Sequence, residues 1–185
     1  MKETTDHQLM LAVRDGDLDK LGHLFEKYHQ QLYNFFRRQL GNPQTSEDMV
    51  QDVFYKMLKY RHTYRGQGKF TTWMFSIAHN TKIDYFRKMK RPMDSIDDGP
   101  ELVSVAPNPA ELSEMSDRHD LLYRALERLS DERREVLLLS RFQNMKYREI
   151  AEVMGCTTGA IKKRAFLAIR DLQSIFKELN DGKVQ

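Results

Sequence analysis

The chain has 185 residues, of which 40% are hydrophobic and 31% charged, a composition that indicates a soluble, charge-rich and helical protein. No apolar run approaches the length of a membrane span, and the N-terminal residues lack the apolar core of a signal peptide, so we expect a cytoplasmic protein with no membrane insertion of its own. The single cysteine, Cys156, excludes an intramolecular disulfide, and neither a metal site nor a cofactor is expected.

The net charge of +3 is distributed unevenly along the chain. Residues 35–91 hold twelve lysines and arginines against four acidic residues, and residues 121–185 hold thirteen against nine. Between these blocks, residues 92–120 hold one arginine against eight acidic residues. Two basic blocks on either side of an acidic bridge indicate a polyanion that is contacted at two places.

Helical periodicity starts close to the N-terminus. Between Leu9 and Gln39, apolar residues recur at spacings of three and four, which predicts one long amphipathic helix or two shorter helices broken near Gly16. The residues that make up this apolar stripe are Leu21, Leu24, Phe25, Tyr28, Leu32, Phe35 and Phe36. Residues 41–43, with the sequence Gly-Asn-Pro, predict a stop and a turn.

A second helix is expected to start at Thr45 or Ser46, because either residue is a good N-cap. Its predicted buried face consists of Val50, Val53, Phe54, Met57 and Leu58. The opposite face carries Asp48, Gln51, Asp52, Tyr55 and Lys59. This polar face either docks a protein partner or is simply solvated. The following residues, 65–69, contain two glycines and predict a flexible connector, since they lack the order of a Walker motif.

Residues 70–91 interleave aromatic and basic side chains. The aromatic members include Trp73, Phe75, Tyr85 and Phe86, and the basic end holds Arg87, Lys88, Lys90 and Arg91. Rings stack on exposed bases while cations follow phosphates, so the pattern suits single-stranded nucleic acid. An amphipathic core helix with a solvated basic tail explains it equally well. The polar middle, residues 79–81, contains weak helix formers where the helix could break or present a pocket.

Residues 93–112 are rich in proline and acidic residues and have no helical period, which predicts an extended linker. Periodicity then resumes over residues 121–129, and Ser130 is expected to cap a helix whose core is Val136 to Leu139 with Phe142. A short helix over 147–154, closed by Gly155, precedes a last helix over about 158–179.

Two helices joined by a glycine-containing turn, the second with three cations near its start, predict a DNA-binding helix-turn-helix. A helix fits the major groove, where the residues of its first turns reach base edges or phosphates. The side chains expected to project outward are Thr157, Thr158, Lys162, Lys163 and Phe166. Phe166 lies off the apolar stripe, which fits either a contact with a thymine methyl group or a partner surface.

Three segments in this order resemble the extracytoplasmic-function sigma factors of bacteria, a group of the sigma-70 family, over nearly the whole chain. SEDMVQDVFYKML (46–58) is similar to the group's helix for binding core RNA polymerase. FTTWMFSIAHNTKIDYFRK (70–88) is similar to its promoter-melting and −10-recognition segment. LSDERREVLLLSRFQNMKYREIAEVMGCTTGAIKKRAFLAIRDL (129–172) is similar to the helix-turn-helix that reads the −35 element.

The resemblance implies an all-α fold of two small helical domains joined by a flexible acidic linker. The implied parts are a sigma region 2 domain over 1–92, a linker over 93–118, and a region 4 helix-turn-helix domain over 119–182. Asp48, Gln51, Asp52 and Phe54 match the polymerase-docking pattern, with Phe54 in the core and the polar residues, together with Tyr55, facing the partner.

For the −10 element, Asn80 matches the position on a loop that receives a flipped non-template base. The expected contacts along this strand are Arg65, Lys69, Thr71, Thr72, Trp73, Asn80, Thr81, Lys82, Tyr85, Arg87, Lys88 and Arg91. The expected −35 contacts are Thr157, Thr158, Gly159, Ala160, Lys162, Lys163, Arg164 and Phe166. The group commonly has an arginine where this chain has Leu167, a departure that concerns one contact with the DNA backbone.

The implied function is that of an alternative sigma factor, with core RNA polymerase, promoter DNA and an anti-sigma factor as partners and no stable homo-oligomer. A conventional helix-turn-helix regulator is a second interpretation, although such proteins usually need a dimer interface and no heptad supplies one. A third is a polymerase-bound adaptor that never melts DNA, against which residues 70–91 argue. An enzyme is not expected, because the six histidines show no ligand spacing and no nucleophile motif is present.

Overall fold

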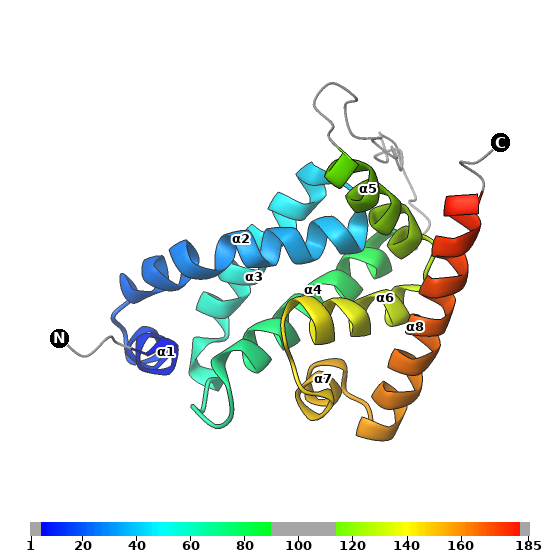
Figure 1. Cartoon of the computed structure of the whole chain (residues 1–185). Coiled ribbons are helices and arrows are strands. Elements are labelled where there is room, and N and C mark those ends of the chain that lie inside the picture. The colour runs from blue at the N-terminus through cyan, green and yellow to red at the C-terminus, as the bar shows by residue number, and fades with distance from the viewer. Residues whose placement is uncertain (1–4, 90–113, 182–185) are drawn as a thin grey trace. The chain divides into compact units, whose positions relative to one another are not determined.

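A computed structural model describes residues 5–89 and 114–181, with side chains described from residue 121 onward in the second range. All regular structure in these residues is helical, which confirms the predicted all-α fold. The chain divides into two compact units, built mainly from α1–α4 and from α5–α8 (Figure 1). Most of the predicted linker lies outside the described residues, while residues 114–118 already belong to the first helix of the second unit.

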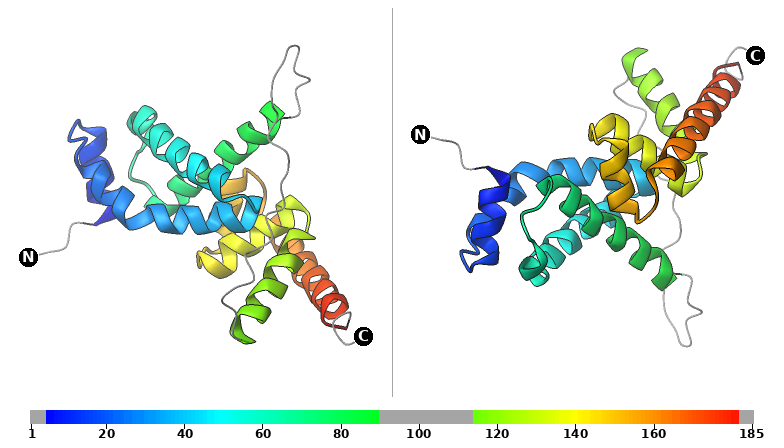
Figure 2. Two further views of the ribbon diagram at one scale, coloured as in Figure 1. Left: turned by 90° about the horizontal axis from the view of Figure 1, so that it is seen from above. Right: turned by 90° about the horizontal axis from the view of Figure 1, so that it is seen from below.

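The first unit contains four α-helices and a short 3₁₀ turn. Their bounds are α1 (Asp6–Arg14), α2 (Lys20–Leu40), α3 (Pro43–Lys59), η1 (Arg61–Thr63) and α4 (Phe70–Met89). Of the two arrangements left open for the N-terminal stretch, the structure has the broken one, since Gly16 adopts a φ of +114° between α1 and α2. Figure 2 shows α1 beyond the N-terminal end of α2 in both views.

The core of the first unit forms where α2, α3 and α4 meet. Phe35 of α2 lies edge-to-face against Phe75 of α4, with ring centroids 5.3 Å apart. Leu32 of α2, Met57 of α3 and Met74 of α4 are also fully buried. Each fully buried apolar side chain of this size contributes about 1.5–3 kcal/mol to folding. Together these side chains hold α4 against α2 and α3.

Two local predictions for this unit are wrong. Helix α3 starts at Pro43 rather than at Thr45 or Ser46, because Asn42 is the N-cap and its side chain accepts a hydrogen bond of 2.9 Å from the Thr45 amide. Helix α4 runs without a break through residues 79–81, so Asn80 lies on a helix and not on a loop. The Thr81 hydroxyl donates to the Ile77 carbonyl at 2.8 Å, which accommodates this polar residue inside the helix.

The second unit contains α5 (Glu114–Glu127), α6 (Asp131–Leu137), a π-helical turn η2 (Leu138–Phe142), α7 (Tyr147–Met154) and α8 (Thr158–Asp181). Helices α5 and α6 both pack on α8. Leu126, Leu139, Ile150 and Ile161 are fully buried in this unit. Phe142, which periodicity places in the core, is 40% exposed, because η2 ends the regular helix before that position returns to the buried face.

The turn between α7 and α8 agrees with the prediction. Gly155 adopts the left-handed conformation at φ 62° and ψ 36° and closes α7, as a C-cap glycine does. The Thr157 hydroxyl accepts a hydrogen bond of 3.1 Å from the Ala160 amide and so caps α8. Among the residues that the structure describes, no helix combines the length and apolar character needed to cross a membrane.

Candidate nucleic-acid interface

The candidate site of the first unit begins at the loop of residues 64–69. Tyr64 is 2% exposed, and its ring meets Trp73 edge-to-face with centroids 5.0 Å apart. Both glycines of the loop have positive φ values, 69° and 78°, which lets the chain turn sharply before α4. Arg65 and Lys69 are both exposed. The loop therefore presents two cations, and the packing of Tyr64 against Trp73 holds its first residue in place.

The other residues predicted to contact a single strand differ in exposure along α4. Exposed are Asn80, Arg87 and Lys88. Partly exposed are Thr71, Trp73 and Tyr85. Buried are Thr72, Thr81 and Lys82. Arg91 lies outside the described residues. The exposed and partly exposed side chains are accessible to a ligand, whereas those of Thr72 and Thr81 contribute mainly to the packing of the helix.

Asp84 balances part of the positive charge on α4. Its carboxylate pairs with Lys56 of α3 at 2.9 Å and with Arg87 at 2.8 Å. The hydrogen bond from Lys56 is the main cause that lowers the pKa of Asp84 below its usual range, and the charges of Lys56, Arg87 and Lys88 add to it. Asp84 therefore stays ionised and ties α3 to the basic end of α4.

The polar face predicted for α3 is exposed as expected. Asp48, Gln51, Asp52 and Tyr55 are all on the surface, and Tyr55 is 62% exposed. The opposite face is buried, with Phe54 7% exposed. The face thus has the accessibility that a protein-docking surface needs, and its role stays a prediction.

An open groove between α2 and α3 adjoins this polar face, and the sequence did not indicate it. Its volume is about 290 Å³, and Gln51 is one of its lining residues. Phe25, assigned by periodicity to the apolar stripe, is 42% exposed. Its ring stacks on that of His29, with centroids 5.1 Å apart, and meets that of Phe54 edge-to-face, with centroids 4.9 Å apart. The spacing of Phe25 and His29, one helical turn apart, is a sequence signal that could have indicated an aromatic pair on this face of α2. A large aromatic on the wall of a groove is a candidate anchor for a protein partner.

The second unit presents the start of α8 to solvent. Thr157, Gly159, Lys162, Lys163 and Phe166 are exposed, while Thr158 and Ala160 are partly exposed. Phe166 is 69% exposed, the highest value among the exposed large hydrophobic residues of the described chain. An exposed ring beside two cations on the first turns of a helix suits a major groove, in which thymine methyl groups lie between phosphate rows.

Arg164 differs from the other predicted contacts on α8. Its guanidinium pairs with Glu132 of α6 at 3.0 Å and also donates to the Cys156 thiol at 3.4 Å. Arg164 therefore links α8 to α6 and to the turn. A phosphate contact by the same side chain would compete with the Glu132 pair.

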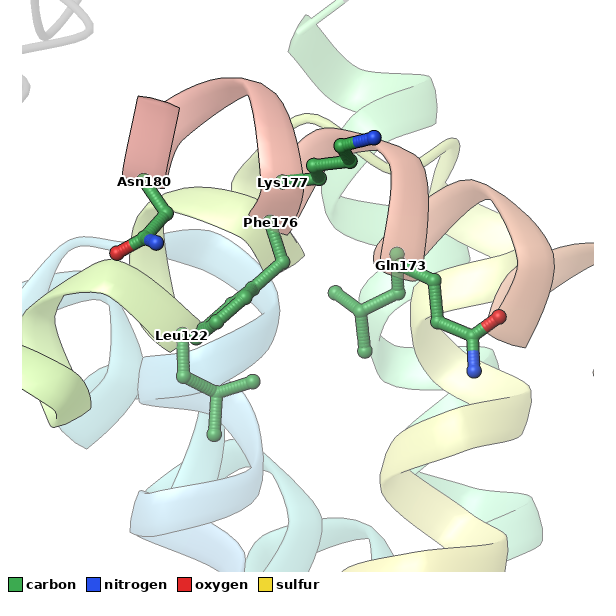
Figure 3. A pocket seen from close by; sticks show the side chains of 6 residues that line it. Leu122, Gln173, Phe176, Lys177 and Asn180 are labelled. Atoms are coloured by element: carbon green, nitrogen blue, oxygen red, sulfur yellow. The ribbon is translucent and has the colours of Figure 1, made fainter. Parts of the chain in front are cut away.

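A second groove lies between α5 and α8, at the far end of α8 from Thr158. Its volume is about 400 Å³, and its apolar floor consists of Leu122, Leu172 and Phe176. Figure 3 shows the side chains of Phe176 and Leu122 side by side, and Gln173, Lys177 and Asn180 complete the lining. The groove is on the opposite end of the helix from the basic residues, so it is separate from the candidate DNA surface.

No cluster of three or more histidine, cysteine or acidic side chains that could hold a metal ion occurs among residues 5–89 and 121–181. The two candidate surfaces are instead a basic and aromatic helix in one unit and a basic and aromatic helix-turn-helix in the other. Comparison with protein families matches these same two places. Residues 24–92 match "Sigma-70 region 2", and residues 119–172 match "Sigma-70, region 4".

The chain belongs to the extracytoplasmic-function sigma factors. It is 30% identical to the RNA polymerase sigma factor YlaC of Bacillus subtilis over 74% of this chain and 80% of that protein. It is also 27% identical to the ECF RNA polymerase sigma-E factor of Escherichia coli over 100% of this chain and 96% of that one. Proteins of this family are transcription initiation factors, and promoter-specific initiation is the function of this sigma factor.

Solved structures support the fold of this sigma factor. CnrH, solved in complex with the cytosolic domain of CnrY, aligns with a TM-score of 0.70 and 22% identity over 94% of this chain and 97% of that one. RpoE of Bartonella quintana, solved with the anti-sigma factor NepR, aligns with a TM-score of 0.67 and 24% identity over 84% of this chain and 96% of that one. At these identities the likeness concerns the fold.

Proposed function

We propose that this sigma factor holds the −35 duplex with α7 and α8 and captures an unpaired −10 base with the 64–69 loop and α4, while α3 docks on core RNA polymerase. The observation that carries the proposal is the presence, in one chain, of an exposed basic and aromatic helix-turn-helix and a separate basic and aromatic helix. Duplex and single-stranded DNA require different surfaces, and a promoter being opened offers both. We assign the protein no catalytic residue.

The −35 contact is argued from the start of α8. Lys162 and Lys163 are exposed in its second turn and would neutralise phosphates of the DNA backbone. Phe166, one turn after Lys162, would lie against base edges, where a ring can contact a thymine methyl group. The cations then supply affinity at any sequence, and the ring supplies part of the preference for one sequence.

The −10 contact is argued from energetics. Stacking of one base on an aromatic side chain is worth about 1–3 kcal/mol, and extruding a base from a duplex costs a few kcal/mol. The half-exposed Trp73 and Tyr85 and the exposed Asn80 can offset that cost only in part. Stable opening therefore needs core polymerase as well, and two modest contacts on one chain reinforce each other through effective concentration.

The docking contact is argued from α3 and the adjoining groove. Asp48 and Asp52 present acidic groups, Tyr55 presents an exposed ring, and Phe25 forms an apolar wall next to them. An exposed aromatic anchor bordered by charged residues is typical of a protein-binding surface. A basic and partly apolar element of polymerase would complement this surface in charge and shape.

Control by an anti-sigma factor is part of the proposal. The solved structure of Bartonella quintana RpoE is a complex with the anti-sigma factor NepR, and that of CnrH is a complex with the cytosolic domain of CnrY. A partner of this kind would keep the sigma factor from polymerase by covering the α3 face. Competition between the partner and core polymerase for Tyr55→Ala and wild-type protein would measure that overlap.

The experiment that tests the proposed function uses Asn80→Ala. Asn80 is exposed and its replacement by alanine suits a helix, so the fold is retained. We expect slower open-complex formation with unchanged binding to core polymerase. Asp52→Ala provides the converse case, with weakened polymerase binding, and Asp19→Ala, an exposed acid in the α1–α2 turn, is the matched control. Loss of polymerase binding by Asn80→Ala would refute its assignment to the −10 site.

A further inference from the structure

Helix α1 lies outside the segment that matches sigma-70 region 2, which begins at residue 24. It nevertheless packs on η1 and on α4, the two elements that flank the 64–69 loop. A capping box at its start and Asp6, which accepts hydrogen bonds of 2.6 Å from both Lys27 and Tyr28 of α2, hold it in place. The helix is thus a firmly attached element with no assigned role.

His7 of α1 contacts the loop at two points. Its Nδ1 atom is 3.0 Å from the Tyr64 hydroxyl, and the two rings meet edge-to-face with centroids 5.8 Å apart. Its ring also lies against Gly66 so closely that a Cβ atom at residue 66 would come within 2.5 Å of Cε1. Arg14 adds a long contact of 3.5 Å from its guanidinium to the Tyr64 carbonyl.

From this arrangement we infer that His7 is a positioning residue for the −10 site, which holds the 64–69 loop in the conformation that presents Arg65 and Lys69 to the melted strand. The inference rests on the proposed function of that loop. A loop with two glycines has many conformations when free, and a strand that binds it would have to order it first. The contacts of His7 with Tyr64 and Gly66 remove that cost before DNA arrives.

The test measures binding of a labelled non-template single strand with its −10 block to the complex of core polymerase and full-length sigma factor. We expect His7→Ala to weaken this binding about fivefold, the effect of losing one ordinary hydrogen bond. Tyr64→Phe, which keeps the ring against Trp73 and removes only the hydroxyl, should show a comparable loss. His62→Ala, an exposed histidine of η1, is the matched control and should bind as the wild type does.

A double-mutant cycle separates positioning from a general structural role. In a protein that already carries Arg65→Ala and Lys69→Ala, His7→Ala should have no further effect on strand binding, because the side chains that it positions are gone. Equal losses in both backgrounds, or wild-type binding by His7→Ala, would overturn the inference. If the wild-type complex itself does not bind the −10 strand, the proposed −10 contact is refuted, and the inference about His7 is refuted together with it.

Discussion

Replacement of Lys162 by alanine gives a quantitative test of the −35 surface. The residue is exposed in the second turn of α8, next to Lys163 and one turn before Phe166. Alanine is the best helix former, so the substitution removes a charge without disturbing the helix. If Lys162 neutralises one phosphate, its loss should flatten the slope of log binding constant against log salt concentration by about 0.9.

That slope converts into a measurable change of affinity. Between 50 and 200 mM salt, one phosphate contact contributes a factor of about 3.5 to the loss of affinity, because a fourfold change in salt is raised to the power 0.9. The double variant Lys162→Ala/Lys163→Ala should therefore have a slope flatter by about 1.8. Its affinity should fall about 12-fold less than that of the wild type between 50 and 200 mM salt.

The assay is fluorescence anisotropy of a labelled −35 duplex titrated with full-length protein at four salt concentrations. Lys177→Ala is the matched control, because Lys177 is exposed on the same helix but lies fifteen residues further on, about 22 Å along the axis. Its slope should equal that of the wild type. A Lys162→Ala slope equal to that of the wild type would refute the phosphate contact, and an equal change in Lys177→Ala would show that the effect is a general consequence of net charge.

Three further predictions concern stability, each measured by urea unfolding with the appropriate variant. Tyr28→Phe should cost about 2 kcal/mol at pH 7 by removing a hydrogen bond to the Asp6 carboxylate. Burial and, to a lesser extent, Asp6 raise the pKa of Tyr28, so the wild type should lose stability above about pH 10. The variant should lose less over the same range, because Tyr64 is then the tyrosine that keeps a raised pKa. Asp84→Asn should cost less than about 1 kcal/mol at pH 7, since the carboxylate is 38% exposed. This cost should shrink as the pH falls below about 4, because the lowered pKa of Asp84 stabilises the folded state only while the carboxylate is ionised. Thr157→Ala should cost about 1 kcal/mol through the lost cap of α8. A flat alkaline profile in the wild type, a pH-independent Asp84→Asn effect, or an unchanged midpoint for Thr157→Ala would contradict the respective contact.

The helices and most of their buried faces follow from the periodicity of the sequence. The face of α3 is the clearest example, because Val50, Val53, Phe54 and Met57 are buried. Of the positions between them, Gln51, Asp52 and Tyr55 are exposed and Lys56 is partly exposed. Gly155 and the recognition turn were also predictable, since few residues other than glycine adopt the left-handed conformation that ends α7.

Other features depended on contacts that a sequence pattern does not contain. Weak helix formers at residues 79–81 suggested a break, yet the buried neighbours Phe75 and Ala78 and the Thr81 hydroxyl bond keep α4 continuous. The start of α3 was misplaced because two good capping residues, Thr45 and Ser46, follow Asn42 within the first turn.

The surfaces were harder still to foresee. Phe25 fits the apolar period of α2, but whether such a position is covered depends on the spacing between α2 and α3, which leaves a groove there. The contacts of His7 with Tyr64 and Gly66 join residues almost sixty positions apart, so no local pattern could indicate them. The Glu132 pair of Arg164 likewise depends on how α6 packs against α8.

The most direct test of the central claim is run-off transcription by core RNA polymerase, with and without this protein, on promoter libraries that carry randomised −35 and −10 blocks. The account predicts specific start sites that appear only when the protein is added, with preferred bases in both blocks. Binding to duplex DNA without any polymerase-dependent initiation would contradict it and would favour a conventional helix-turn-helix regulator.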